Sequence, residues 1–271
     1  MKQTFDISEK VVAITGGGGV ICSTLAKEMA ACGAKIAVLD LSFEGAQRTA
    51  DTIVDASGEA IALACNVLNR ESIEQAADAV INHYGRVDVL VNGAGGNHPK
   101  ATTSSEHSFF ELPPESIKWV FDLNCLGSIM PTQVFGKYMA DQNSGCIVNI
   151  ASMSSFRPLT KTLAYSSAKS AVANFTEWAA THFAQEYSPN IRVNAIAPGF
   201  LLTTQNYYLL KNEDGSDTPR GEAIMANTPM HRYGEPKELA GAVIFLCSDA
   251  AKFVTGVVIP IDGGFNAYCG V

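Results

Sequence analysis

Long apolar runs, basic clusters and paired cysteines are all missing from this sequence of 271 residues. No uninterrupted apolar run reaches the ~18 residues of a membrane span. The first ten residues, MKQTFDISEK, lack the apolar centre of a signal peptide. Lys and Arg number 19 against 27 Asp and Glu, giving a net charge of −8 without any basic stripe. We therefore expect a cytoplasmic protein with neither a membrane nor a nucleic-acid partner.

The cysteines do not form a recognisable framework. Their number is odd and no two are spaced as CxxC, so we predict reduced, mostly buried thiols and no metal site. They are Cys22, Cys32, Cys65, Cys125, Cys146, Cys247 and Cys269.

What the sequence does contain is an alternation of strand-like and helix-like segments. Apolar, β-branched runs occupy residues 11–15, 35–40, 60–67, 87–93, 146–152, 191–198 and 257–262. Segments of helical period include 23–33, 71–85, 115–142 and 164–187, and Gly33 and Gly85 stand where left-handed helix caps are expected. Continuous apolar strands alternating with helices predict an α/β fold, a parallel sheet covered on both faces.

Two long stretches, residues 97–114 and 200–236, break this alternation. Both follow strands directly, so we expect them at the carboxyl edge of the sheet, where such folds bind ligands. Loops of this length in a compact domain are usually functional. We predict that they contribute the substrate-binding residues of a single domain spanning residues 1–271.

The stretch TGGGGVICST (15–24) lies between a strand and a helix. Glycines there allow close backbone approach to a pyrophosphate, and a helix N-terminus offers free N–H groups. An NTPase loop would require a Gly-Lys-Ser/Thr sequence, which is absent. Asp40 ends the next strand, where a carboxylate accepts from ribose hydroxyls and repels a 2′-phosphate. Together they favour NAD(H) over NADP, although a bare tight turn and an exposed acid are the simpler alternatives.

Ser152, Tyr165 and Lys169 form a candidate catalytic group. Tyr165 and Lys169 are four residues apart and share one helix face. An ammonium beside a phenol lowers its pKa, so the phenol can exchange a proton with an alcohol or carbonyl oxygen. Taken alone, a Tyr-x-x-x-Lys pair is most often a surface contact.

The order of these motifs along the chain is more specific. TGGGGVI, Asp40, NGAG (92–95), Asn124, Ser152, YSSAK (165–169), NAIAPG (194–199) and IDGG (261–264) follow in the order of the short-chain dehydrogenase/reductase family, which the sequence resembles along nearly its whole length. The resemblance implies a Rossmann-type, doubly wound domain with a seven-stranded parallel sheet. It also implies association as a homotetramer or homodimer.

The same resemblance assigns roles to residues. It implies a catalytic tetrad in which Asn124 holds a proton-relay water near Lys169, and Lys169 also binds the nicotinamide ribose. Cofactor contacts are expected at Gly16, Gly18, Gly19, Val20, Ile21, Asp40, Asn66, Val67, Asn92, Ala94, Gly95, Tyr165, Lys169, Pro198 and Gly199. Pyrophosphate is expected on the backbone N–H groups of residues 18–21.

Two departures from the family pattern concern the cofactor. Val20 and Cys22 replace glycines of the usual TGxxxGxG turn. Asn66 stands where the family commonly has Asp; its amide suits an adenine edge, or it bonds its own loop.

Substrate candidates lie in the irregular segments. Their polar and basic character suits a polyhydroxylated anion better than a steroid or acyl chain. They are Asn97, Arg157, Lys161, Gln205 and Asn206, with His98, Lys100 and Arg220 as further donors. Either Lys161 or Arg157 is expected to pair with a substrate carboxylate, whereas His98 and Arg232 are expected to be structural.

Within the family, GGNHPKATT, SMSSFRPLTKTLAYSSAK and GFLLTTQNYYLL resemble the sugar-acid branch of D-mannonate oxidoreductases (fructuronate reductases). We therefore expect a small sugar acid as substrate. A polyol, gluconate or 3-oxoacyl reductase is the alternative within the family. A catalytically silent NAD-binding regulator is disfavoured because Tyr165 and Lys169 are both present.

Overall fold

The computed structural model describes residues 2–204 and 206–270. Seven strands form one sheet in the order β3-β2-β1-β4-β5-β6-β7, and every neighbouring pair is parallel. The strands are β1 Val11–Thr15, β2 Lys35–Asp40, β3 Glu59–Ala64, β4 Val89–Asn92, β5 Gly145–Ile150, β6 Ile191–Pro198 and β7 Val258–Ile261. The predicted Rossmann-type fold is confirmed, with the reversal of strand order between β1 and β4.

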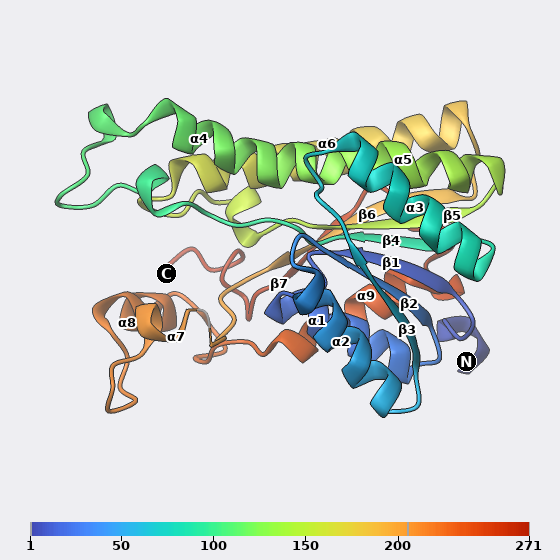
Figure 1. The fold of residues 1–271 in the computed structure, drawn as a ribbon. Coiled ribbons are helices and arrows are strands. Elements are labelled where there is room, and N and C mark those ends of the chain that lie inside the picture. Colours follow the sequence, from blue (N-terminus) through green and yellow to red (C-terminus); the bar gives the residue numbers. More distant parts are fainter. Residues whose placement is uncertain (1, 205, 271) are drawn as a thin grey trace.

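Helices cover both faces of this sheet (Figure 1). They are α1 Val20–Ala31, α2 Phe43–Asp55, α3 Arg70–Tyr84, α4 Pro114–Phe121, α5 Gly127–Asp141, α6 Leu163–Glu186, α7 Tyr207–Leu210, α8 Pro219–Ala226 and α9 Ala240–Cys247. In Figure 1, α3, α5 and α6 lie above the sheet and α1, α2 and α9 below it. Within residues 2–204 and 206–270, no helix is long and apolar enough to cross a membrane.

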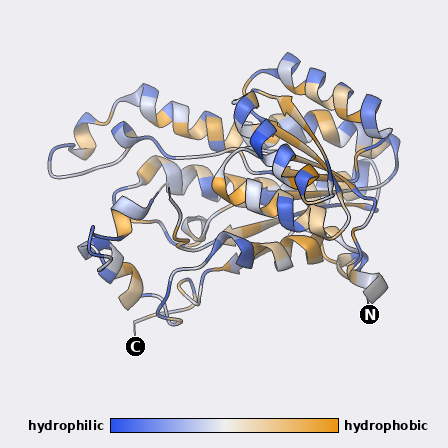
Figure 2. Ribbon diagram, turned by 60° about the horizontal axis from the view of Figure 1, so that its bottom comes forward, coloured by the Kyte–Doolittle hydropathy of each residue, from blue (hydrophilic) through white to orange (hydrophobic). Residues whose placement is uncertain are grey.

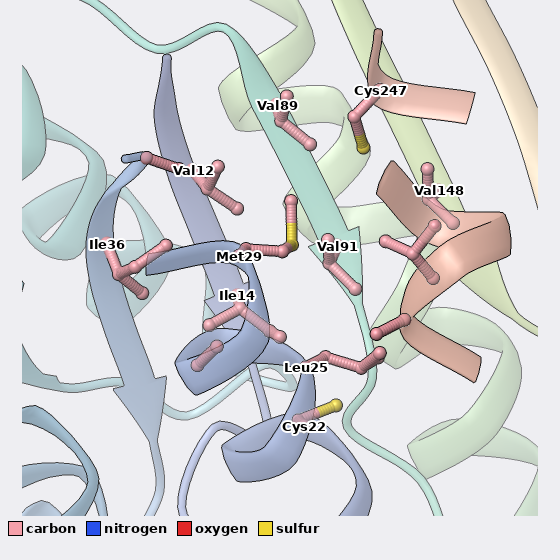
Figure 3. Packing of buried hydrophobic residues seen from close by; sticks show 14 of the residues in the cluster. Val12, Ile14, Cys22, Leu25, Met29, Ile36, Val89, Val91, Val148 and Cys247 are labelled. Atoms are coloured by element: carbon pink, nitrogen blue, oxygen red, sulfur yellow. The ribbon is translucent and has the colours of Figure 1, made fainter. Parts of the chain in front are cut away.

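The core is divided by the sheet into two layers. Side chains of α1 and α9, such as Leu25 and Cys247, pack on one face of β1, β4 and β5, as Figure 3 shows. The other layer gathers Phe135, Met139 and Ile147 against α3 and α6. Hydrophobic residues run through the strands and the inward sides of the helices, and polar residues cover the outward sides (Figure 2). Strands buried on both faces explain why their sequences are continuously apolar.

The structure differs from the expected elements in three places. The predicted helix 115–142 is interrupted by a π-helical segment, Asp122–Leu126, between α4 and α5. The strand predicted to reach residue 67 ends at Ala64. The stretch 200–236 contains α7 and α8, which contact one another and project from the body of the molecule in Figure 1. Gly33 and Gly85 do have positive φ angles, 85° and 78°, as expected at helix ends.

Candidate active site

Two adjoining hollows lie at the carboxyl ends of the strands. One has a volume of about 320 Å³ and includes residues that follow β1, β2, β3 and β4. The other, of about 430 Å³, includes residues that follow β4, β5 and β6. The two share Val20, Ile21, Gly93 and Gly95, so they form one extended cleft over the point where the strand order reverses. This is where open α/β sheets bind ligands.

The first two glycines of the TGGGGVICST turn are required by close packing. Gly16 has φ 67°, and a Cβ there would lie 2.9 Å from the backbone of Ala94. A Cβ on Gly17 would lie 2.5 Å from the Val38 side chain. The backbone of the turn therefore packs directly against the segment after β4 and against β2. No side chain of Gly16 or Gly17 projects from it.

Gly18 is confined by α2 and by Asp40. A Cβ on Gly18 would lie 2.8 Å from the carbonyl carbon of Gly45 in the first turn of α2. The Gly18 N–H donates to Oδ2 of Asp40 at 2.9 Å, and Oδ1 of Asp40 accepts from the Ser42 N–H at 2.9 Å. Asp40 thus joins the glycine turn to the start of α2, a role that the sequence did not reveal.

These bonds bear on which N–H groups of residues 18–21 are free to hold a pyrophosphate. The N–H of Gly18 is directed to Asp40, and that of Gly19 to the carbonyl of Gly16 at 3.0 Å. Val20 and Ile21 open α1, where the first N–H groups have no intrahelical acceptor. The donors available to an anion are therefore those of Val20 and Ile21, and both residues line the two hollows.

Cys22 explains how the turn accommodates its departure from the family pattern. Its thiol lies against Gly93, where a Cβ would come within 2.0 Å of the sulfur. Figure 3 shows Cys22 on the first turn of α1, near Leu25. Burial raises the pKa of this thiol to about 12, so it behaves as a neutral packing group. The absence of a side chain at Gly93 therefore leaves the room that the Cys22 thiol occupies.

Most of the residues expected around adenosine line the smaller hollow. Asp40, Asn66, Val67, Ala94 and Gly95 all line the smaller hollow. Asn66 also accepts the Leu68 N–H at 3.0 Å, so it bonds its own loop as well as facing the hollow.

Asn92 does not line either hollow. Its side chain is buried and donates to Thr132 at 2.9 Å and to Asn149 at 2.8 Å. Asn92 therefore belongs to a polar network that joins β4, β5 and α5 inside the core.

Ser152, Tyr165 and Lys169 line the larger hollow together. Ser152 follows β5, and the other two occupy the start of α6. The Lys169 ammonium lies 5.8 Å from the centre of the Tyr165 ring and donates to the carbonyl of Ile150 at 2.7 Å. The predicted grouping of these three residues in one cleft is thus present in the structure.

Burial sets the protonation of Tyr165 and Lys169 in opposite directions. Burial raises the pKa of Tyr165, and a hydrogen bond with Ser152 offsets this only in part. Burial lowers the pKa of Lys169 to about 8. The phenol is therefore protonated at neutral pH, because burial outweighs the hydrogen bond with Ser152 in setting its pKa.

Asn124 lies in the π-helical segment and is fully buried. Its Nδ2 donates to the carbonyls of Gly96 and Val120 at 2.7 Å each, and its Oδ1 accepts the Gly96 N–H at 3.2 Å. A Cβ on Gly95 would be 2.7 Å from Oδ1 of Asn124 and 3.2 Å from Nζ of Lys169. Gly95 therefore separates the two side chains, and Asn124 fixes the backbone that lies beside Lys169.

The substrate side of the larger hollow is lined by Asn97, Pro198, Gly199, Thr203 and Asn206. Asn206 accepts the Thr203 N–H at 2.8 Å and donates to the Leu201 carbonyl at 2.8 Å, which shapes the start of the loop after β6. Sequence reasoning missed Thr203, together with Gly96, Phe200 and Leu201, because small and apolar loop residues carry no motif.

The two cations expected to meet a substrate carboxylate lie outside this lining. Arg157 is exposed and donates to the carbonyl of Tyr268 at 2.7 Å. Lys161 is exposed, has φ 72°, and offers its carbonyl to the Thr103 N–H at 2.9 Å. The Arg157 side chain and the backbone of Lys161 thus hold loops together.

Of the remaining candidates, those among the described residues also lie outside the lining. Lys100 and Arg220 are exposed, and Gln205 falls outside the described residues. His98 accepts the Lys100 N–H and packs its ring on Trp119 at 5.3 Å. Arg232 pairs with Glu238 at 2.6 Å. His98 and Arg232 thus make the structural contacts expected of them.

Comparison with known proteins agrees with this geometry. The family model described as Enoyl-(Acyl carrier protein) reductase matches residues 19–266. An uncharacterized oxidoreductase of Haemophilus influenzae is 48% identical, covering 98% of this chain and 96% of that protein. The chain belongs to the short-chain dehydrogenase/reductase family. It is an oxidoreductase that acts on alcohol and ketone groups.

Two solved structures of family members are informative about ligands. One from Haemophilus influenza, described provisionally as a D-mannonate oxidoreductase and containing NAD, has a TM-score of 0.92 at 47% identity and covers 98% of both chains. A gluconate 5-dehydrogenase of Burkholderia cenocepacia J2315 in complex with NADP and tartrate has a TM-score of 0.86 at 28% identity, again covering 98% of each chain. The short-chain dehydrogenase/reductase fold of this chain is therefore shared with both NAD- and NADP-bound members.

Proposed function

We propose that this protein is an NAD(H)-dependent oxidoreductase that interconverts D-mannonate and D-fructuronate. The observation that carries the proposal is the lining of the larger hollow. There Ser152, Tyr165 and Lys169 lie with Asn97, Thr203 and Asn206. The first three suit the exchange of a proton at a carbonyl or hydroxyl oxygen, and the other three suit a polyhydroxylated ligand. The likeness to the NAD-containing D-mannonate oxidoreductase structure supports the same substrate class.

The residues present fit an NAD molecule along the extended cleft. The glycine turn leaves backbone room, and Val20 and Ile21 offer N–H groups to the pyrophosphate. Asp40 lines the adenosine end with no cation at Leu41 or Ser42, which supports NAD over NADP. Asn66, Val67, Ala94 and Gly95 would flank adenosine, and Pro198 and Gly199 the nicotinamide. When bound, NAD(H) supplies or accepts the hydride at the substrate carbon.

The protein's own part is to position the substrate oxygen and move its proton. In the reducing direction, the neutral phenol of Tyr165 donates its proton to the oxygen that becomes the hydroxyl. Ser152 donates a hydrogen bond to the same oxygen and holds it next to the Tyr165 hydroxyl. Lys169, anchored on Ile150, places positive charge 5.8 Å from the centre of the Tyr165 ring as the phenolate forms. In the oxidising direction, the phenolate takes the proton back.

The substrate carboxylate is proposed to meet uncharged donors. Asn97, Thr203 and Asn206 line the hollow, whereas Arg157 and Lys161 do not. An amide or hydroxyl donor binds a carboxylate less strongly than a bidentate arginine does. We therefore expect the hydroxyl groups of the sugar acid to contribute much of its binding energy.

A reductase acting on a keto-gluconate is the second candidate. The likeness to a gluconate 5-dehydrogenase favours it, because that enzyme accommodates tartrate, also a hydroxy acid. Following NADH absorbance with D-fructuronate, 5-keto-D-gluconate, polyols and an acyl thioester separates the candidates. The proposal requires D-fructuronate to have the highest kcat/KM, and repetition with NADPH tests the cofactor assignment.

Association into a homodimer or homotetramer is part of the proposal. Helices α5 and α6 carry a hollow of about 540 Å³ on their outer side, lined by Phe175, Trp178 and Tyr187. Trp178 is 58% exposed there, which is unusual for a side chain of this size. Light scattering should give the mass of two or four chains, and Trp178→Glu should reduce it.

A further inference from the structure

A second group of reactive side chains lies at the edge of the sheet opposite the cleft. Cys146 is the second residue of β5, and Arg192 is its register partner on β6. Cys247 ends α9, which packs on β5. All three side chains are buried, and the mechanism uses none of them.

These side chains converge on one backbone carbonyl. The Cys146 thiol donates to the carbonyl of Leu246 at 3.3 Å, and Nη2 of Arg192 donates to the same oxygen at 2.7 Å. Cys247 follows Leu246 directly along the chain, and its thiol and that of Cys146 each shift the pKa of the other. Two sulfur atoms and a guanidinium therefore occupy one small region.

Arg192 has only carbonyl partners in this region. Its guanidinium donates to Val254, Leu246 and Ser248, and in the described part of the chain no ion pair joins it to a carboxylate. The nearby Asp249 pairs with Lys252 at 2.9 Å. A buried cation without a counter-charge is costly, so a thiolate at Cys146 would offset that cost.

A small oxidant has a route to this region. A hollow of about 240 Å³ is lined by Cys146, by the cations Lys10, Arg192 and Lys252, and by the carboxylates Asp88 and Asp249. The three cations outnumber the two carboxylates, and an excess of positive charge beside a cysteine favours its thiolate, the form that reacts with peroxides.

We propose that Cys146 and Cys247 form an oxidisable thiol pair that a hydroperoxide converts to an intramolecular disulfide. The Cys146 thiolate attacks the terminal oxygen of the hydroperoxide; the O–O bond breaks, an S–O bond forms, and the alkoxide or hydroxide leaves with a proton. The Cys247 sulfur then attacks the sulfenic sulfur of Cys146, an S–S bond forms, and water leaves. The two thiols are oxidised by two electrons, and the hydroperoxide is reduced to an alcohol, or to water if it is hydrogen peroxide.

The chain contains its own matched controls. Cys22 and Cys65 are each 3% exposed, against 4% for Cys146, so access is comparable. Burial raises the pKa of Cys22 to about 12 and that of Cys65 to about 11. The neighbouring Cys247 thiol and the charge of Arg192 hold the pKa of Cys146 below its usual value. Faster oxidation of Cys146 than of Cys22 and Cys65 would therefore show that a larger fraction of the Cys146 thiol is ionised.

The experiment uses the folded wild-type protein treated with hydrogen peroxide and alkylated at timed intervals. Mass spectrometry should show the peptides of Cys146 and Cys247 disappearing together. A linked peptide two mass units lighter should appear, at least tenfold faster than oxidation of Cys22 or Cys65. In Cys247→Ser, the sulfenic acid at Cys146 should persist and be trapped by dimedone. Arg192→Gln should slow the reaction several-fold, and Arg192→Lys should keep most of it.

Two results would overturn the proposal. One is that Cys146 and Cys247 stay reduced while Cys22 and Cys65 react. The other is that Cys146 is oxidised without forming a bond to Cys247. Circular dichroism of each variant checks that the fold is intact, and the wild-type comparison with Cys22 and Cys65 does not depend on any variant.

Discussion

Lys169 donates a hydrogen bond of 2.7 Å to the carbonyl of Ile150. This bond ties the first turns of α6 to the last residue of β5, directly before the loop that carries Ser152. The amino group is buried and its pKa is lowered to about 8. One side chain thus fixes the position of the catalytic loop and keeps a titratable charge beside Tyr165.

This buried ammonium should make stability depend on pH. The folded pKa of Lys169 lies below its ordinary value of 10.5. Between about pH 8 and 10.5 the unfolded chain therefore holds more protons at this position, and the free energy of unfolding rises with pH. Relative to Lys169→Met, the wild type should gain up to about 3 kcal/mol over this window. Urea unfolding of both proteins at several pH values measures this, and parallel curves would contradict the assignment.

Tyr165→Phe should abolish turnover while leaving NADH binding nearly intact. The substitution removes only the phenolic oxygen, so the proton donor is lost and kcat should fall about 10³-fold. Tyr84→Phe, at the last residue of α3 and outside both hollows of the cleft, is the matched control and should keep its activity. Stopped-flow turnover and fluorescence titration with NADH separate the two effects. A turnover rate of the variant within tenfold of the wild type would contradict the assignment of Tyr165 as the proton donor.

The protonated state of Tyr165 predicts opposite pH profiles for the two directions. Because burial raises its pKa, the phenol is ready to donate at neutral pH. Reduction by NADH should therefore be constant through neutral pH and fall in alkali, whereas oxidation by NAD should rise with pH as the phenolate forms. Profiles of kcat/KM in both directions check this, and a reduction rate that rises with pH would contradict it.

Gly18→Ala should damage the cofactor turn. The added methyl group would lie 2.8 Å from the carbonyl carbon of Gly45, so α2 or the turn must move. We expect a loss of about 1–3 kcal/mol in unfolding free energy and weaker NADH binding. Gly241→Ala is the control, since nothing lies within 4 Å of its Cβ in α9 and alanine favours a helix. Equal effects of the two substitutions would refute the close packing of α2 on the turn.

Asp40→Asn should reduce the preference for NADH over NADPH. The carboxylate that repels a 2′-phosphate is lost, while the amide oxygen still accepts one of the N–H groups of Gly18 and Ser42. The ratio of kcat/KM for the two cofactors should change at least tenfold. An unchanged ratio would show that the charge of Asp40 does not select the cofactor.

The sequence predicted the sheet well and the loops poorly, for physical reasons. Strands buried on both faces are continuously apolar, so β1, β2 and β6 are predicted residue by residue. The π-helical segment that holds Asn124 was missed, because apolar spacing does not distinguish one extra residue in a turn. The contact of Arg157 with Tyr268 joins residues 111 positions apart, and no local pattern records it. The bond of Asp40 to the glycine turn depends on the position of β2 beside β1. The sequence alone therefore predicted the effect of the Asp40 charge on the cofactor but not this bond.

The substrate assignment is tested most directly by comparing D-fructuronate with 5-keto-D-gluconate under NADH, using wild type and Tyr165→Phe in parallel. We expect oxidation of NADH with D-fructuronate at a kcat/KM at least tenfold above that for the gluconate derivative, and no oxidation of NADH by the variant. No turnover of D-fructuronate by the wild type, with rapid turnover of the other ketone, would contradict it.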